Sequence, residues 1–101
     1  MSCQHARPMG RFAGHNVVCH LLGLPMLPLR IDWYSTILDL GPWGAVYTEG
    51  WDRAVVFQGA PAKRTKEIIN RQRIYPPASH DHRVSLDAAA PTMQTPPASF
   101  R

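Results

Sequence analysis

The feature that most constrains the fold is a turn-forming segment at residues 41–44, Gly-Pro-Trp-Gly, which separates two runs of strand-forming residues. Residues 33–40 and 45–48 are rich in β-branched and aromatic side chains, which favour strands. Glycine and proline mark the reversal because a tight turn needs backbone angles that most residues disfavour. We therefore predict a β-hairpin with a four-residue loop. After a second turn at residues 49–53, residues 55–57 fit either a third short strand or a helix entry.

A first helix is predicted over residues 8–22, before the hairpin. Pro8 suits the first turn of a helix and Gly23 suits its end. Together with Gly14, large apolar side chains at helical spacing form one continuous stripe: Val17, Val18, Leu21 and Leu22. A second face carries only small residues, Ala6, Gly10 and Ala13. Either the small face packs tightly against another helix, or it lets a backbone or a flat ligand approach closely.

A second helix is predicted to open at residues 58–61 and to run to about Arg73, because Pro76 and Pro77 end it. The predicted fold class is therefore α+β. It comprises an N-terminal helix, a β-hairpin or short antiparallel sheet, and a second helix within residues 1–77. Residues 78–101 carry few large apolar side chains and are predicted to be a disordered tail.

The hairpin is expected to be the structural centre of this small domain. Its three tryptophans, Trp33, Trp43 and Trp51, are expected to cover the apolar stripe of the first helix. A domain of this size buries a modest share of its surface, so it could not spare a large aromatic side chain.

The net charge of +4 is concentrated in residues 60–73, which carry five basic side chains and one acidic side chain: Lys63, Arg64, Lys66, Arg71 and Arg73 against Glu67. One function consistent with this pattern is a small basic module that docks on nucleic acid or on an acidic partner. The blander interpretation, which we favour over nucleic-acid binding, is a solvated cationic face.

Other chemistry is weakly represented. Two cysteines are too few for a disulfide scaffold, and neither a membrane span nor a secretory signal is evident, so we expect a cytoplasmic protein with reduced thiols. No Gly-rich nucleotide loop and no C-x-x-C motif is present.

His15 and Cys19 have a spacing that could place two ligands on one metal ion, but the further histidines His80 and His82 fall in the predicted tail. We therefore predict no metal site.

Two stretches resemble the carboxy-terminal part of FAD-containing NADH dehydrogenases of the pyridine-nucleotide oxidoreductase type. The first runs Ser-Cys-Gln-His-Ala at residues 2–6, with Met9-Gly10 and Gly14-His-Asn following it. The second is the Gly, Pro and Trp-rich stretch at residues 38–51. The resemblance continues to Ile-Tyr-Pro-Pro at residues 74–77, so it covers about residues 1–77.

The resemblance implies a role for the start of the first helix. In this family the corresponding helix points its amino terminus at the flavin ring, which suits the electron-rich edge of a reduced flavin. By resemblance, Cys3, Gln4 and His5 would lie beside the isoalloxazine ring and near a quinone or other acceptor. Gly10 would leave room for the ring.

The resemblance also implies that this chain lacks the FAD-binding and NAD(P)H-binding Rossmann domains, which would have to be supplied in cis or in trans. We therefore expect FAD in the complete protein only, with no cofactor bound by the isolated chain and no NADH oxidation by it. Either the reading frame is truncated or the other domains are encoded separately. The family also allows a peripheral contact with the inner face of the membrane.

Overall fold

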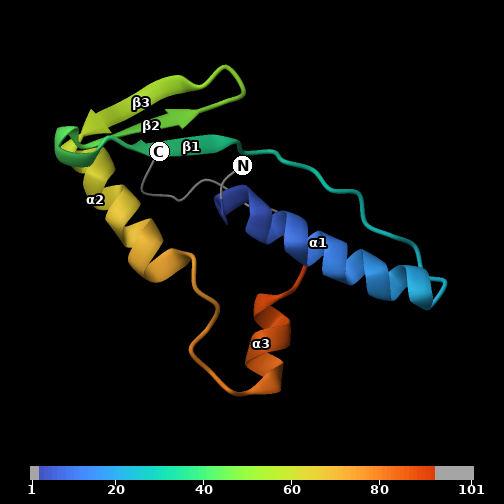
Figure 1. Cartoon of the computed structure of the whole chain (residues 1–101). Helices are drawn as coiled ribbons and strands as arrows, with labels where there is room; N and C mark the ends of the chain where they lie inside the picture. The colour runs from blue at the N-terminus through green and yellow to red at the C-terminus, as the bar shows by residue number, and fades with distance from the viewer. Residues whose placement is uncertain (1–2, 93–101) are drawn as a thin grey trace. The chain divides into compact units, whose positions relative to one another are not determined.

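The computed structural model describes residues 3–92 and divides into two compact units (Figure 1). Unit 1 combines residues 1–32 with residues 76–101, and unit 2 is the continuous segment Trp33–Tyr75. Helices and one antiparallel sheet make up the described residues, which confirms the predicted α+β class.

Unit 2 is a three-stranded antiparallel sheet followed by a helix. Its strands β1 (Ser35–Asp39), β2 (Ala45–Glu49) and β3 (Ala54–Gly59) lie in the order β1-β2-β3. Helix α2 (Ala60–Ile68) starts directly after β3 and continues into a π-helical turn, η2 (Ile69–Arg73). The predicted hairpin and second helix are confirmed, and residues 55–57 belong to a strand.

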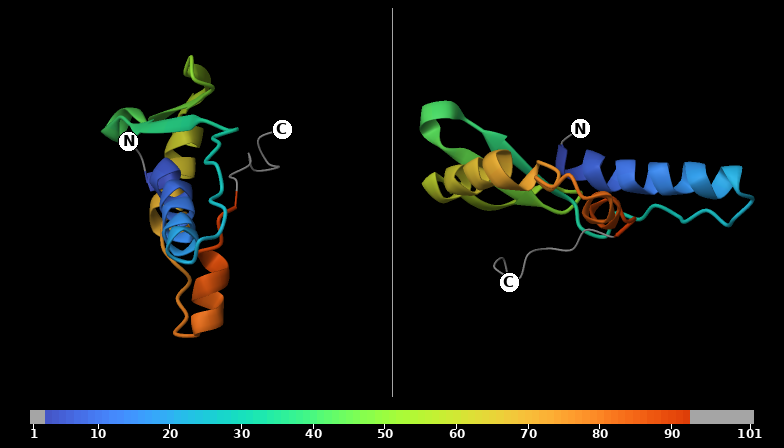
Figure 2. Two further views of the ribbon diagram at one scale, coloured as in Figure 1. Left: turned by 90° about the vertical axis from the view of Figure 1, so that its right-hand side faces the viewer. Right: turned by 90° about the horizontal axis from the view of Figure 1, so that it is seen from below.

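The core of unit 2 lies between the sheet and α2, which lie against each other in Figure 2. Ala45 and Tyr47 of β2 and Ala62 of α2 are almost completely buried. Tyr47 and Phe57 face each other across β2 and β3, and their rings stack with centroids 4.7 Å apart. This cross-strand pair fixes which sheet face is covered, because a slip of one residue would turn both rings outward.

Two of the three tryptophans lie outside this core, and the expectation that the tryptophans cover the first helix concerns both units and stays a prediction. Trp43 is 84% exposed and Trp51 is 70% exposed, whereas Trp33 packs against the core of unit 2. Trp43 ends the short 3-10 helix η1 (Gly41–Trp43) in the hairpin loop, and Trp51 lies in the turn before β3. Both positions lie beyond the last paired residues of the strands, so neither ring extends over the covered face.

Unit 1 begins with helix α1 (Cys3–Leu21), which starts five residues earlier than predicted. Pro8 therefore lies inside the helix, and the prediction that it occupies the first turn was wrong. At this position the missing amide of Pro8 removes the helix hydrogen bond to the carbonyl of Gln4.

The buried side of α1 is not the predicted apolar stripe. His5, Phe12 and Cys19 are buried, and their spacing of seven residues places them on one side of the helix. The predicted stripe is exposed, with Leu21 at 77% and Val17 at 59%. The side chains of the predicted stripe are therefore not the ones that α1 buries.

A connector over residues 22–32 runs back beside α1, as Figures 1 and 2 both show. The Asn16 side chain holds it there, since its amide nitrogen donates to the Leu27 carbonyl and its oxygen accepts from the Leu27 amide, both at 2.9 Å. Asn16 lies on the same side of the helix as His5 and Phe12. The connector is therefore fastened to the buried side, and the predicted stripe stays outside.

Helix α3 (His82–Ala88) lies in the segment that was predicted to be disordered, so that prediction was wrong for these residues. Asp81 explains the helix, because its carboxylate accepts the amides of Arg83 at 2.7 Å and Val84 at 3.4 Å as an N-cap. The prediction of a tail over residues 93–101 lies outside the described residues.

Candidate functional site

The start of α1 carries the residues that the family resemblance singled out. Cys3, Gln4 and His5 form its first turn. The first turn of a helix directs backbone amides outward and carries the positive end of the helix dipole. These three residues therefore place backbone donors where an electron-rich group could approach along the helix axis.

The side chains of these residues point in different directions. Successive residues of an α-helix are rotated by about 100°, so Cys3 and Gly10 share one side, and His5 lies opposite. Cys3 is exposed and forms no disulfide, whereas His5 is only 8% exposed. Burial lowers the pKa of His5, so the imidazole stays neutral to lower pH than an exposed histidine.

The small-residue face has room beside it. Ala6, Gly10 and Ala13 are exposed, and a Cβ atom placed on Gly10 would meet nothing within 4 Å outside the helix's own backbone. This face could accept a flat ligand or a second backbone, as the sequence suggested.

A pocket of about 350 Å³ adjoins this face within unit 1. Its walls come from α1, from the two prolines and from α3: Arg7, Gly10, Arg11, Pro76, Pro77, Ser85, Ala88 and Ala89. Sequence reasoning missed this pocket because it assigned no structure to the segment containing α3. An Asp at position 81 followed by helix-forming residues was the signal that could have revealed it.

The basic residues of segment 60–73 do not form one free cationic face. Lys63 donates to both carboxylate oxygens of Asp39 at 2.7 Å and lies 3.4 Å from the Gly41 carbonyl. This hydrogen bond, together with one from the Gly41 amide, lowers the pKa of Asp39. Lys63 therefore ties α2 to the hairpin loop.

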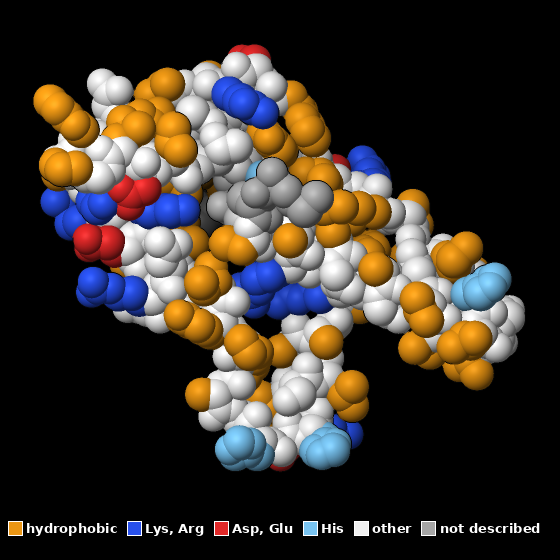
Figure 3. Space-filling view, in the orientation of Figure 1, with side chains coloured by type: hydrophobic (Ala, Val, Ile, Leu, Met, Phe, Trp, Pro, Cys, Tyr) orange, Lys and Arg blue, Asp and Glu red, His pale blue; other side chains and the backbone are white. Residues whose placement is uncertain are grey.

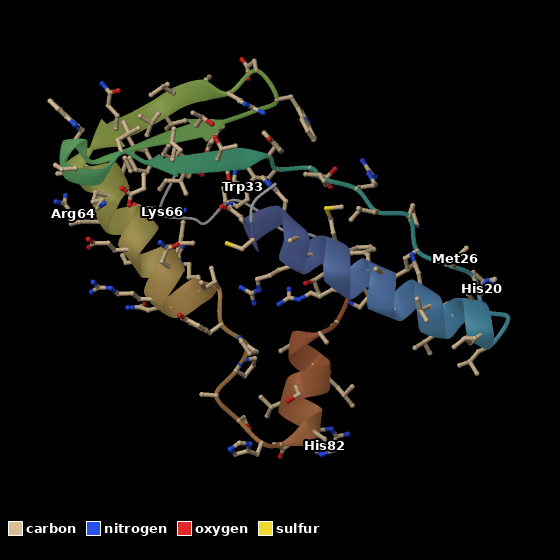
Figure 4. All side chains as sticks on the ribbon, in the orientation of Figure 1. His20, Met26, Trp33, Arg64, Lys66 and His82 are labelled. Atoms are coloured by element: carbon tan, nitrogen blue, oxygen red, sulfur yellow. The ribbon has the colours of Figure 1, made fainter. Side chains whose placement is uncertain are left out.

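The remaining cations of α2 are divided between its two sides. Figure 4 shows Arg64 and Lys66 projecting from opposite sides of the helix. Arg64 is exposed, Lys66 is half-buried, and the acidic Glu67 is exposed and directly follows Lys66 in sequence. Arg71 and Arg73 are exposed as well, so the alternative of a docking module for nucleic acid or an acidic partner stays a prediction.

His15 and Cys19 lie together as their spacing suggested, with the imidazole Nε2 atom 3.3 Å from the thiol sulfur. Among residues 3–92, no group of three or more His, Cys, Asp or Glu side chains is placed to hold a metal ion. In this structure the pair is a contact between a buried thiol and its helix neighbour.

The most conspicuous surface of unit 1 is apolar. We call it the apolar end of α1, and it comprises eight large side chains that are all more than 40% exposed: Val17, Val18, Leu21, Leu22, Leu24, Met26, Leu27 and Leu29. Figure 3 shows hydrophobic side chains gathered at this end of the helix, where Figure 4 labels His20 of α1 and Met26 of the connector. Within the described residues, no helix is both long and apolar enough to span a membrane.

Comparison with known proteins identifies relatives of this chain. It is 62% identical over 97 residues to proteins named NADH dehydrogenase-like protein from two strains of Mycobacterium tuberculosis. The match covers 96% of this chain and 24% of each relative, so the chain spans about a quarter of their length. No family model matches the chain. No solved structure matches it either.

The name of these relatives places them among the oxidoreductases. At 62% identity over nearly its whole length, this chain is a relative of those NADH dehydrogenase-like proteins and corresponds to one part of them. The resemblance predicted from the sequence is thereby confirmed.

Proposed function

We propose that this chain is the carboxy-terminal part of an FAD-containing NAD(P)H oxidoreductase and does not oxidise NADH by itself. The observation that carries the proposal is the 62% identity to relatives of which most of the length lies outside the matched region. The complete enzyme would pass electrons from NAD(P)H to the flavin and then to a quinone or another acceptor. Its place would be the cytoplasm, on the inner face of the membrane where the acceptor is a quinone.

The partner in this proposal is the remainder of the enzyme, the FAD-binding and NAD(P)H-binding domains. The apolar end of α1 supports it, because large apolar patches on a protein surface mark sites of contact with other surfaces. Eight large apolar side chains gathered at one helix end are costly to leave in water, and a covering domain removes that cost.

Cys3, Gln4, His5 and Gly10 are the residues proposed to approach the flavin, which supplies the hydride acceptor when bound. The backbone donors of the first turn and the space beside Gly10 fit an aromatic ring that carries electron-rich atoms. His5 fits only in part, since its side chain is buried and would act through its backbone amide. Cys3 is the side chain that shares the open side with Gly10.

The test compares the chain alone with the chain co-expressed with FAD-binding and NAD(P)H-binding domains of a relative. The isolated chain is expected to purify colourless and without NADH-dependent dye reduction, and co-expression is expected to give a yellow, active complex. A yellow, dye-reducing preparation of the isolated chain would overturn the proposal.

A matched pair of variants tests the residues. In the complex, Gly10→Leu is expected to weaken flavin binding and acceptor turnover far more than NADH binding. Gly14→Leu is the control, because a Cβ atom placed on Gly14 would likewise meet nothing within 4 Å, but Gly14 lies one turn further from the helix start. If both variants behave alike, the helix start has no special relation to the flavin.

A further inference from the structure

The pocket between α1 and α3 is lined by two arginines of α1, Arg7 and Arg11. Arg7 and Arg11 are four residues apart, so two like charges lie one above the other on the same side of the helix. No Asp or Glu precedes Asp32 in the sequence, so α1 itself has no acidic side chain to place beside Arg11.

The rest of the chain does not neutralise Arg11 either. In the part of the chain that the structure describes, no carboxylate forms an ion pair with Arg11, whereas Arg30 pairs with Asp32 and Lys63 pairs with Asp39. Arg7 and Arg11 are both half-buried. A half-buried guanidinium has lost part of its hydration, so an anion placed against it is bound more strongly than at an open surface.

The other walls of the pocket leave room for such an anion. Gly10 separates the two arginines along the helix, and Ala88 at the end of α3 and Ala89 directly after it also line the pocket, so these three walls carry only small side chains. Ser85 adds a hydroxyl group, which now donates to the Asp81 carbonyl at 3.1 Å. Figure 3 shows Lys and Arg side chains reaching the surface where α1 lies above α3.

We propose that this pocket binds a phosphate group, and a diphosphate more tightly than a single phosphate. Each guanidinium offers parallel N–H donors that match two phosphate oxygens. Two arginines one helical turn apart present two such forks, with the Ser85 hydroxyl as a further donor after rotation of its side chain. The proposal does not depend on the role in an oxidoreductase, because its donors are Arg7, Arg11 and Ser85, and it shares only Gly10 with the residues proposed to approach the flavin.

The experiment is calorimetric titration of the full chain with inorganic pyrophosphate and, separately, with inorganic phosphate at low ionic strength. Saturable binding of one pyrophosphate per chain is expected, with weaker binding of phosphate. Arg11→Gln is expected to weaken pyrophosphate binding about tenfold or more, as for the loss of a charged hydrogen bond. Arg64→Gln is the matched control, since it removes the same charge from an exposed position on α2 and should leave affinity within about twofold.

A second variant keeps the charge and fills the space. Ala88→Leu is expected to abolish saturable binding, while the helical circular dichroism of the chain shows that it remains folded. Sedimentation with vesicles of phosphatidylcholine, with and without phosphatidic acid, distinguishes a lipid phosphate from a free one. The proposal is supported if the chain binds free pyrophosphate or the phosphatidic acid vesicles and if both Arg11→Gln and Ala88→Leu weaken that binding. No saturable binding of any probe, or equal loss in Arg64→Gln, overturns it.

Discussion

Unit 2 closes around a small core although several of its large apolar side chains stay exposed, whereas unit 1 has even fewer buried apolar residues and gathers its exposed ones at one end of α1. In unit 2 the sheet and α2 bury Ala45, Tyr47 and Ala62 almost completely. In unit 1 only Phe12 and Cys19 are buried apolar residues among those that the structure describes, and the apolar end of α1 stays exposed. Both units contain helices, so the difference lies in what covers each helix rather than in the kind of element.

This difference shows in which unit another element of the same chain covers the helix. A two-layer arrangement of sheet and helix can close around one core, and unit 2 does so with 43 consecutive residues, Trp33–Tyr75. Unit 1 joins two separate segments around a single long helix, so it has fewer side chains to cover that helix. Unit 1 is therefore where we expect further contacts.

The largest expected effect is on the core of unit 2. Tyr47→Ala removes a stacked ring that is 1% exposed, and we expect it to lower the free energy of unfolding by about 3–5 kcal/mol. All three tryptophans lie in unit 2, so their fluorescence during urea unfolding follows this unit. Trp43→Ala is the exposed control in the same unit, and Leu21→Ala in unit 1 is followed by amide hydrogen exchange in α1; each should change stability by less than about 0.5 kcal/mol. An equally large effect of Leu21→Ala would break the contrast between the units.

The next effect contrasts two glycines. A Cβ atom on Gly44 would lie 2.6–2.7 Å from backbone atoms of Gly59, and the φ angle of Gly44 is 101°. We expect Gly44→Ala to destabilise unit 2 by about 1–3 kcal/mol, because the backbone must shift. Gly14→Ala in α1 meets nothing and should stabilise unit 1 by about 0.5–1 kcal/mol. Thermal unfolding should show midpoints that move in opposite directions, and a shift of the same sign in both would contradict the expectation.

A smaller effect concerns the fastening of the connector to α1. Asn16→Ala removes both hydrogen bonds to Leu27, and because the pair is exposed we expect a cost of about 1 kcal/mol. Amide hydrogen exchange at Leu27 should become faster while exchange in β2 stays unchanged. Unchanged exchange at Leu27 would mean that other contacts hold the connector.

The smallest effects are those of pH, and they should separate the units. Burial lowers the pKa of His5 below its ordinary value of 6.5, so below that pH the unfolded chain takes up a proton more readily than the folded one. Unit 1 should therefore lose stability as the pH falls below about 6.5. In unit 2 the group that matters is Asp39, whose pKa is lowered from its ordinary value of 3.8. Unit 2 should therefore keep its stability until the pH falls below about 3.8. Hydrogen exchange for unit 1 and tryptophan fluorescence for unit 2, followed from pH 7 to 3, would check this order.

The dependence of stability on pH above pH 10 tests unit 2 alone. Burial raises the pKa of Tyr47 to about 12, and its hydroxyl donates to a Glu49 carboxylate oxygen at 3.1 Å. Between pH 10 and about 12 the unfolded chain loses this proton while the folded chain keeps it, so unit 2 should become less stable as the pH rises. Tyr47→Phe keeps the ring and removes the titrating group, and it should abolish this dependence. A dependence that survives in Tyr47→Phe would belong to another group.

The sequence by itself determined the elements that local signals encode. The turn at residues 41–44, the alternating strands around it and the proline that opens α2 are short-range features, and all three appear in unit 2. The family resemblance was also visible in the sequence, because residue identities carry it without any knowledge of contacts. The candidate residues Cys3, Gln4 and His5 were expected just before a helix over residues 8–22, whereas they form the first turn of α1.

Tertiary structure decided which faces are covered. Val17 and Leu21 have the spacing of a buried stripe, but the bonds from Asn16 to Leu27 fasten the connector to the side of Phe12 instead. Periodicity identifies an apolar face without saying what lies against it, because the free energy of burial depends on contacts between residues distant in sequence. For the same reason the pocket of Arg7 and Arg11 could not be predicted. It exists only because α3, some 75 residues further along the chain, lies beside them.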